Sequence, residues 1–275
     1  SECALPISLA GVSKTFIIEG YGSSAGDMVK WVTTNDSCIG GGAMLNTDGN
    51  PLHDKNNFAL STSLLSGKQT IVTAKFNYAG GPYFACYQFG DEPFKPYPSL
   101  PLYISTVSSL KSSMRAAETH IVANESKLIT FFGTGVRQGD TAYFSADVTD
   151  GNMCAAGDSA TTAATLDASL QSSITVPDAT IGKTLKLCYR FGTEPWAVMP
   201  PTLSVLAVTS LAADAGAADA AVVGQSKSWT VNGAGVTGGD KAKWVVPSAN
   251  ACLNGTSDAE GGTSEVSIVG GKLVT

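Results

Sequence analysis

The sequence has few charged side chains and only two histidines, and both shortages narrow the range of functions. Charged residues make up 15% of the 275 positions, and 17 basic against 23 acidic residues give a net charge of -6. Binding to nucleic acid requires clustered Lys and Arg, so we expect no nucleic-acid partner. His53 and His120 lie away from any recurring Ser, Asp or Cys, which leaves a Ser-His-Asp triad without support. We therefore expect no catalytic residues and no cofactor.

Long apolar runs and closely spaced cysteines are also missing. No run approaches the roughly 18 apolar residues of a membrane-spanning helix, so we expect no membrane span in this segment. No Cys-x-x-Cys pair occurs, which argues against zinc ribbons and thioredoxin-type redox motifs, and we expect no metal site. The stretch 233–238 matches the dinucleotide-binding pattern Gly-x-Gly-x-x-Gly, but no β-α-β pattern surrounds it. We interpret it as a turn.

What the sequence does contain is an internal repeat. The segment 13–32 returns without a gap as 126–145 and again as 226–245. A second signature, Cys-Tyr-x-Phe-Gly-x-Glu-Pro followed by an aromatic residue, occurs at 86–94 and 188–196. Recurrence of long signatures at a nearly constant spacing indicates tandem units.

The repeat predicts where the units begin and end. We expect one unit at 1–108, a second at 109–209, and a linker with an incomplete third unit at 210–275. The third copy lacks the second signature, so we interpret the chain as a piece of a longer protein. The Ala-rich stretch 211–223 is the one place where we expect a short helix.

Each copy of the first signature predicts a strand, a glycine-rich turn and a second strand, because glycine recurs where the chain must turn tightly. The segments that follow alternate polar and apolar residues with the period of a strand. Six or seven short strands per unit favour an all-β fold of tandem immunoglobulin-like β-sandwiches, about 100 residues each. An aspartate follows the last glycine of each turn, at Asp27, Asp140 and Asp240. We expect it to cap the turn backbone, with inter-domain calcium as the alternative.

The six cysteines predict an oxidising compartment. Two cysteines occupy matching places in each of the first two units, so one disulfide per unit is the simplest arrangement, joining Cys38 to Cys86 and Cys154 to Cys188. Such bridges indicate a secreted or cell-surface protein. Two cysteines are left over as unpaired or inter-unit thiols, namely Cys3 and Cys252.

Three Asn-x-Ser/Thr sites support secretion and predict N-linked glycans at Asn35, Asn124 and Asn254. The high Ser and Thr content also suits O-linked glycans. An insertion peculiar to the first unit, 46–57, carries oxygen ligands at alternate positions. It is a candidate ligand loop, although a proline replaces the glycine of a calcium loop and a solvated turn is the simpler interpretation; its ligand residues are Asn46, Asp48, Asn50 and Asp54.

The two signatures resemble known repeats. The Gly-x-Gly-x-x-x-Gly-Asp pattern between two strands is similar to the immunoglobulin-like repeats of the transcription-factor and plexin type (IPT/TIG). A cysteine pair with the second signature resembles repeats of large algal and other protist surface proteins, including the shafts of flagellar mastigonemes. The resemblance covers nearly the whole chain and implies structural, adhesive or filament-forming roles without catalytic residues.

The sequence and the resemblance together leave three hypotheses about function, of which the first is the one we expect. The first is an extracellular structural glycoprotein that forms or decorates a cell-surface or flagellar filament, with other copies of itself or other extracellular structural proteins as partners. The second is an adhesion or glycan-binding ectodomain of a larger surface protein. The third is an enzyme whose catalytic part lies outside this chain. The four tryptophans fall where other copies have bulky apolar residues, which favours core positions over a sugar-binding platform.

Overall fold

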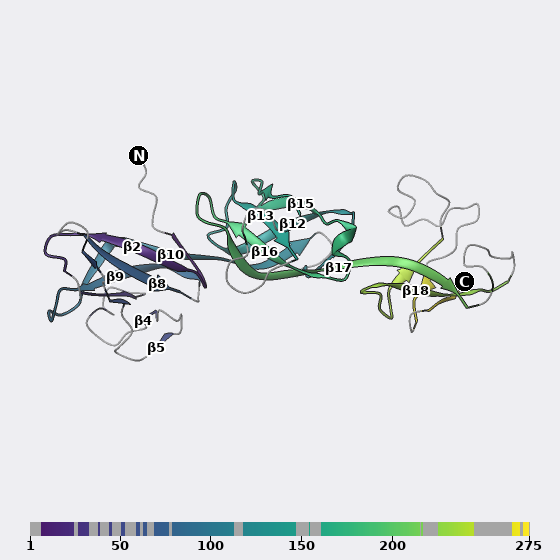
Figure 1. Ribbon diagram of the computed structural model, residues 1–275, viewed down its shortest axis with the longest axis horizontal. Coiled ribbons are helices and arrows are strands. Elements are labelled where there is room, and N and C mark those ends of the chain that lie inside the picture. Colours follow the sequence, from purple (N-terminus) through teal and green to yellow (C-terminus); the bar gives the residue numbers. More distant parts are fainter. Residues whose placement is uncertain are drawn as a thin grey trace.

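The computed structural model places three groups of strands one after another along the long axis of the molecule (Figure 1). We call them units 1, 2 and 3 in chain order. The structure describes residues 7–24, 27–32, 38, 44–45, 51–52, 59–60, 63–64, 69–76, 79–112, 118–146, 154, 161–214, 216, 225–244, 266–269 and 272–274.

Unit 2 is a two-layered β-sandwich. One sheet joins the end of β10 to β12 and β15, and the other has the order β14-β13-β16-β17, with β11 parallel to β17. A 3-10 turn, η2 (Asp178–Thr180), precedes β16. The strands are β10 (Lys95–Ser112), β11 (His120–Val122), β12 (Ser126–Thr134), β13 (Thr141–Ser145), β14 (Ala164–Thr165), β15 (Gln171–Thr175), β16 (Thr184–Arg190) and β17 (Ala197–Ala213).

The core of unit 2 lies between these two sheets. Successive side chains of a strand point to opposite faces, and on β12 Ile129 and Phe131 are both fully buried. They pack in one cluster with Phe144, Leu187 and Tyr189 from the facing sheet. If β10, β12 and β15 are taken as strands A, B and E, and β13, β16 and β17 as strands C, F and G, the two sheets form the immunoglobulin arrangement. The predicted class, all-β with tandem immunoglobulin-like sandwiches, is therefore confirmed.

Unit 1 repeats this plan. A sheet with the order β10-β9-β3-β4-β5, extended by β1 and β6, faces a three-stranded sheet β2-β8-β7. Its core centres on Trp31, whose ring lies 5.2 Å from that of Phe76 and 5.4 Å from that of Phe16. The strands are β1 (Ile7–Leu9), β2 (Ser13–Glu19), β3 (Met28–Val32), β4 (Met44–Leu45), β5 (Pro51–Leu52), β6 (Ala59–Leu60), β7 (Ser63–Leu64), β8 (Gln69–Lys75) and β9 (Gly80–Gln88).

The described residues of unit 3 form four strands of their own. Strand β18 pairs with β17 on one side and β21 on the other, and β19 pairs with β20. The buried cluster among these residues is formed by Val231 and Ile268, with Trp244 partly buried against it. The strands are β18 (Ser228–Ala234), β19 (Lys241–Ala242), β20 (Val266–Ser267) and β21 (Lys272–Val274).

Two long strands each belong to two units. The first half of β10 pairs with β9 of unit 1, and from Thr106 onward it pairs with β12 of unit 2. In the same way β17 pairs with β16 up to Ser204 and with β18 from Ala207 onward. A one-residue shift in pairing marks each crossing, at Val107 and at Val208. The last strand of one sandwich therefore continues as the first strand of the next.

The shared strands change one sequence-based expectation. Residues 210–213, expected to begin a linker, continue β17 and pair with β18. The first residues of the Ala-rich stretch are therefore extended rather than helical. The backbone pairing along β18 outweighs the modest helix preference of alanine, because tertiary context routinely overrides propensity. Residues 217–224 lie outside the part of the chain that the structure describes.

Both expected disulfides are present, and neither crosses its sandwich. Cys38 is bonded to Cys86 with 5.6 Å between their Cα atoms, and Cys154 to Cys188 with 5.5 Å. Cys188 lies between Leu187 and Tyr189 on β16, and both neighbours belong to the main core, so the cysteine points to the outer face of the sheet. There it packs in a separate small cluster with Tyr143 and Cys154, against the partly buried Trp196.

Removing one bridge should weaken one unit. Cys38→Ala should lower the free energy of unfolding of unit 1 by about 2–4 kcal/mol, because the reduced chain gains freedom when it unfolds. Unit 2 should keep its wild-type protection. Hydrogen exchange resolved by residue can follow the two units separately. Cys154→Ala is the matched control and should affect unit 2 instead. Equal losses in both units would contradict independent cores.

Candidate functional site

A buried carboxylate lies at the start of β13 in unit 2. Asp140 is fully buried, and its Oδ2 accepts hydrogen bonds from the backbone N–H of Arg137 and the hydroxyl of Tyr189, both at 2.9 Å. Its Oδ1 accepts the backbone N–H of Gly192 at 2.7 Å. The aspartate of the first signature thus joins the tyrosine and the glycine of the second.

Unit 1 contains the same network. Asp27 is 1% exposed. Its Oδ2 accepts the Tyr87 hydroxyl at 2.6 Å and the Ser24 backbone N–H at 2.7 Å. Its Oδ1 accepts the Gly90 backbone N–H and the Ser24 hydroxyl, both at 2.9 Å. The expected turn cap is therefore present, but it is only half of the arrangement. Because both oxygens already accept protein donors, this carboxylate is not placed to hold inter-domain calcium.

In each unit one partner of the network has a shifted pKa, namely the aspartate in unit 1 and the tyrosine in unit 2. Burial alone would raise the pKa of Asp27, but hydrogen bonds from Tyr87, Ser24 and Gly90 outweigh it and hold the pKa below its ordinary value. Burial, and then the hydrogen bond to Asp140, raise the pKa of the Tyr189 hydroxyl well above its usual range. Tyr189 therefore remains a neutral donor at physiological pH.

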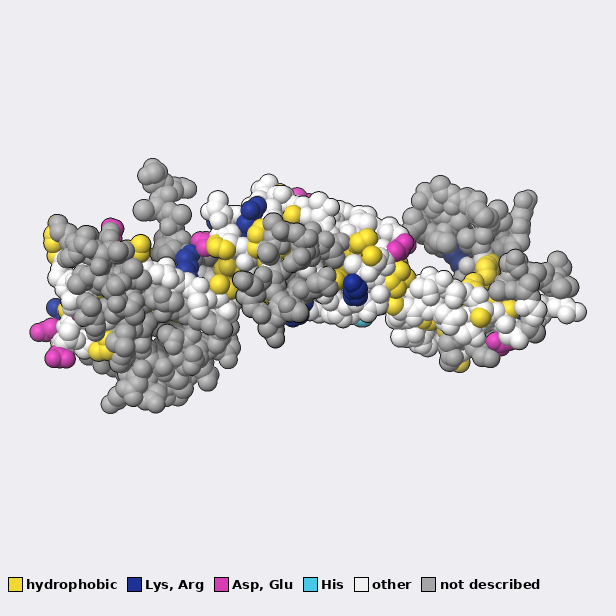
Figure 2. Space-filling view, viewed as in Figure 1, with side chains coloured by type: hydrophobic (Ala, Val, Ile, Leu, Met, Phe, Trp, Pro, Cys, Tyr) yellow, Lys and Arg dark blue, Asp and Glu magenta, His cyan; other side chains and the backbone are white. Residues whose placement is uncertain are grey.

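The joint between units 1 and 2 brings together residues far apart in the sequence. Lys14 on β2 forms an ion pair at 2.9 Å with Glu194, which lies in the turn between β16 and β17. Figure 2 shows basic and acidic side chains meeting where these two units join. The backbone N–H of Val107, at the crossing of β10, lies 3.4 Å from the sulfur of Met199. A hollow of about 600 Å³ beside the joint is lined in part by Gly11 and Met199.

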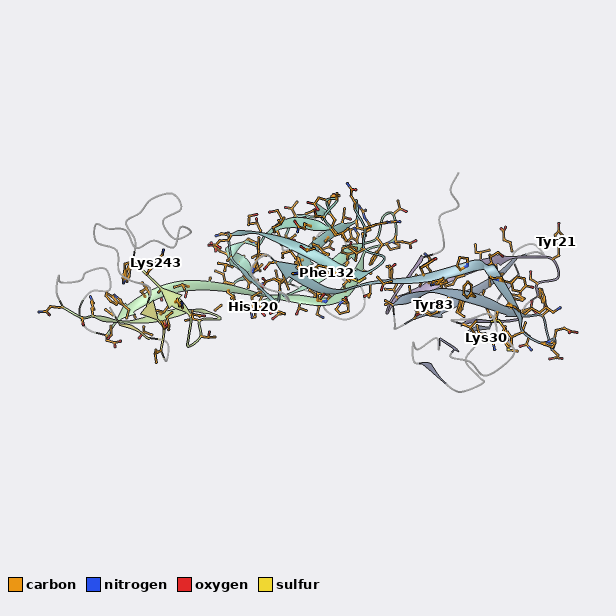
Figure 3. All side chains as sticks on the ribbon, turned by 180° about the vertical axis from the view of Figure 1, so that it is seen from behind. Tyr21, Lys30, Tyr83, His120, Phe132 and Lys243 are labelled. Atoms are coloured by element: carbon orange, nitrogen blue, oxygen red, sulfur yellow. A yellow bond between two sulfur atoms is a disulfide. The ribbon has the colours of Figure 1, made fainter. Side chains whose placement is uncertain are left out.

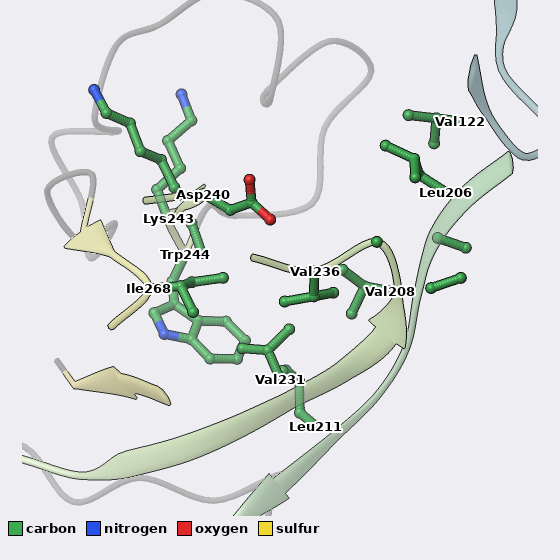
Figure 4. A pocket seen from close by; sticks show the side chains of 15 residues that line it. Val122, Leu206, Val208, Leu211, Val231, Val236, Asp240, Lys243, Trp244 and Ile268 are labelled. Atoms are coloured by element: carbon green, nitrogen blue, oxygen red, sulfur yellow. The ribbon is translucent and has the colours of Figure 1, made fainter. Parts of the chain in front are cut away.

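A second hollow, of about 460 Å³, opens in unit 3. Figure 4 shows Trp244 and Ile268 beside Val231 around this space. In unit 2 the corresponding residues are covered by side chains of β16, and the sequence holds no counterpart of that strand for unit 3. Asp240 is exposed, and its carboxylate accepts hydrogen bonds from the backbone N–H and the hydroxyl of Thr237 in its own turn. The hollow is thus lined by residues of unit 3 that correspond to core positions of unit 2.

The remaining sequence-predicted residues are placed as follows. Asn124 lies exposed in the turn between β11 and β12 with a positive φ of 59°, so its side chain is accessible, and its glycosylation stays a prediction. The ring of His120 contacts the Thr119 hydroxyl at 2.8 Å. Outside the described residues lie Cys3, Asn35, Asn46, Asp48, Asn50, His53, Asp54, Cys252 and Asn254.

The described ranges contain neither a metal-binding cluster nor a membrane-spanning helix. There, no group of three or more His, Cys, Asp or Glu side chains is placed to hold a metal ion. None of the helices found in that part of the chain has the length and apolar character needed to cross a bilayer. The network and the joint are therefore the features that we consider further.

Comparisons with known proteins show likeness only among solved structures. No family model matches the chain, and no curated protein sequence does. A marsupial T cell receptor is 10% identical over 89% of this chain and 87% of its own, with a TM-score of 0.30. The DIP-gamma IG1+IG2 structure is 9% identical over 73% of this chain and 92% of its own, with a TM-score of 0.26. Likeness at this level carries no argument about function.

Removing one hydroxyl tests the network. Tyr189→Phe keeps the ring that packs 5.9 Å from Phe131 and 4.6 Å from Phe191 but leaves the buried Asp140 short of a donor. We expect the free energy of unfolding of unit 2, measured in urea, to fall by about 1–3 kcal/mol. Tyr103→Phe is the control, since that hydroxyl makes no hydrogen bond within the described residues. Equal, small losses in both variants would contradict a structural role for the network.

Acid should weaken unit 1 through Asp27. Because the pKa of Asp27 is lowered by folding, its contribution is complete above the unfolded value of about 3.9 and is lost as the pH falls through the lower folded value. Urea unfolding of unit 1 should therefore show falling stability below about pH 4. Tyr87→Phe should shrink this decline, because the Tyr87 hydrogen bond lowers that pKa most. An unchanged decline in the variant would exclude the network as its source.

Proposed function

We propose that this protein is an extracellular structural glycoprotein whose tandem immunoglobulin-like units form or decorate a cell-surface or flagellar filament. The observation that carries the proposal is that β10 and β17 each belong to two units. At these joints one continuous, paired strand replaces a flexible connection. Tension along the array would pass through backbone ladders rather than through a loose linker.

Further features support an extracellular structural role. A disulfide in each of units 1 and 2 suits an oxidising compartment. The ion pair between Lys14 and Glu194 adds a side-chain contact across the first joint, which would limit bending there. An exposed sequon at Asn124 could carry a glycan, which would discourage unwanted pairing between strand edges. The proposed partners are other copies of this protein or other extracellular structural proteins.

The family resemblance refines the proposal. The first signature is similar to IPT/TIG-type repeats, and the second resembles the repeats of protist surface proteins such as mastigoneme shafts. We propose membership of such an array. In the two units that contain both signatures, the aspartate, tyrosine and glycine that define them form one network. The two signatures would then recur because they stabilise the fold of each unit, as a structural array requires.

Electron microscopy of the secreted protein, prepared without reductant, tests the proposal. We expect stiff rods or filaments with a bead every ~40 Å, as end-to-end sandwiches should give. Inserting Gly-Ser-Gly between Ser108 and Ser109 would interrupt β10 at its crossing and should widen the angle distribution at that joint. The same insertion after Gly216, beyond the end of β17, is the matched control. Flexible single particles with saturable glycan binding would instead support the adhesion ectodomain.

A further inference from the structure

Glycine is required where a shared strand crosses onto the next unit. A Cβ atom added to Gly133 would meet the Thr106 carbonyl oxygen and lie 2.8 Å from the Val107 Cα. At the second crossing, a Cβ on Gly233 would meet the Ala207 carbonyl oxygen and lie 2.9 Å from the Val208 Cα. No real Cβ tolerates such contacts with backbone, so these glycines mark where another strand passes.

The second glycine of the same pattern also lies against the crossing strand. Gly135 and Gly235 have positive φ values of 79° and 75°. A Cβ on Gly135 would meet the Ser105 side chain, and one on Gly235 the Leu206 side chain. Both glycines of the pattern are therefore in contact with the preceding strand in units 2 and 3.

Unit 1 has the same two glycines with nothing against them. Gly20 and Gly22 correspond to Gly133 and Gly135, and Gly22 has an equivalent φ of 80°. A Cβ built on either would meet nothing within 4 Å. Figure 3 shows Tyr21, which lies between them, at the end of unit 1 away from unit 2. No described residue of unit 1 occupies the position that a crossing strand takes in the other units.

The core beside these glycines is also incompletely covered. Phe16 and Ile18 on β2 are only partly buried, whereas their counterparts in unit 2, Ile129 and Phe131, are fully buried. In unit 2 the shared strand contributes Leu110, 2% exposed, to the cluster that contains both residues. Unit 1 shows what this sandwich looks like without that leucine.

An exposed glutamate, Glu92, also belongs to this end of unit 1. Glu92 is the counterpart of Glu194, and the backbone N–H of each donates to the phenylalanine carbonyl three residues earlier, at 3.0 Å in both. Glu194 binds Lys14 of the preceding unit, whereas Glu92 is exposed. Lysine recurs at the Lys14 position in all three copies, so a further unit of this type would offer Glu92 the same cation.

We propose that Gly20, Gly22, Phe16 and Ile18, here called the Gly20 face, dock the last strand of a further unit of this repeat type, whose lysine at the Lys14 position would pair with Glu92. That strand would pass its carbonyl over Gly20 and place a leucine over Phe16 and Ile18, as β10 does on β12. In a second copy of this chain, both strands of this kind are already paired within their own units. The inference does not depend on a filament role, because an adhesion array would extend in the same way.

The proposal is tested by adding a strand of this kind to the chain. Because Ser13 corresponds to Ser126, residue 113 corresponds to the position just before Ser1, so residues 101–113 added before Ser1 fall into register. We expect hydrogen exchange at the backbone amides of residues 16–20 to be at least about tenfold slower in the extended chain. The added strand would have to dissociate before these amides could exchange.

Gly20→Ala separates docking from a general effect. Its φ lies outside the positive range and nothing surrounds it, so the 275-residue chain should be unchanged by the substitution, while the extended chain should lose the gained protection. Gly133→Ala should destabilise its own crossing in either chain. The proposal is overturned if the extension leaves exchange unchanged, or if it protects the Gly20→Ala variant equally. It is also overturned if the unextended chain is a dimer that Gly20→Ala dissociates, because a second copy would then occupy the face.

Discussion

An ionised carboxylate can be buried only if protein donors replace the water that it loses, and this constraint organises each complete unit. Asp27 and Asp140 meet it with a turn N–H, a tyrosine hydroxyl and a glycine N–H. The turn before β3 or β13 is thereby held against the end of β9 or β16. The two strands that pair at the centre of the sheet are fixed in register by the same contacts.

Side chains alternate between the two faces of a strand, so burying the aspartate also determines on which face the disulfide lies. Since the tyrosine must point inward to reach the aspartate, its neighbour Cys86 or Cys188 must point outward. Each disulfide therefore fastens a loop onto the outer face of a sheet, where Phe94 or Trp196 packs against it. In antibody domains the bridge crosses between the two sheets. Here the sandwich interior is held by aromatic packing and the aspartate network.

Neighbouring units are joined by strands that they share, β10 and β17. The strand that closes one sandwich opens the next, and it crosses so near the following sheet that only glycine fits at Gly133 and Gly233. A joint of this kind has little freedom to bend, because a bend would break pairing on both sides of the crossing. The Lys14–Glu194 ion pair adds a contact whose partners are 180 residues apart. The stiffness proposed for the array would then depend on the joints as much as on the units.

The sequence alone determined the repeat, the all-β class and the matched cysteine positions, because each is visible in local spacing. It indicated half of the aspartate site, the turn cap, which involves residues three apart. Tertiary structure decided the other half, because Asp27 and Tyr87 are 60 residues apart and meet only when β3 pairs with β9. It also decided that residues 210–213 extend β17 rather than begin a linker, and that the pattern glycines serve a crossing strand. Such contacts depend on which strands pair, and the pairing of strands far apart in the sequence cannot be predicted from local spacing.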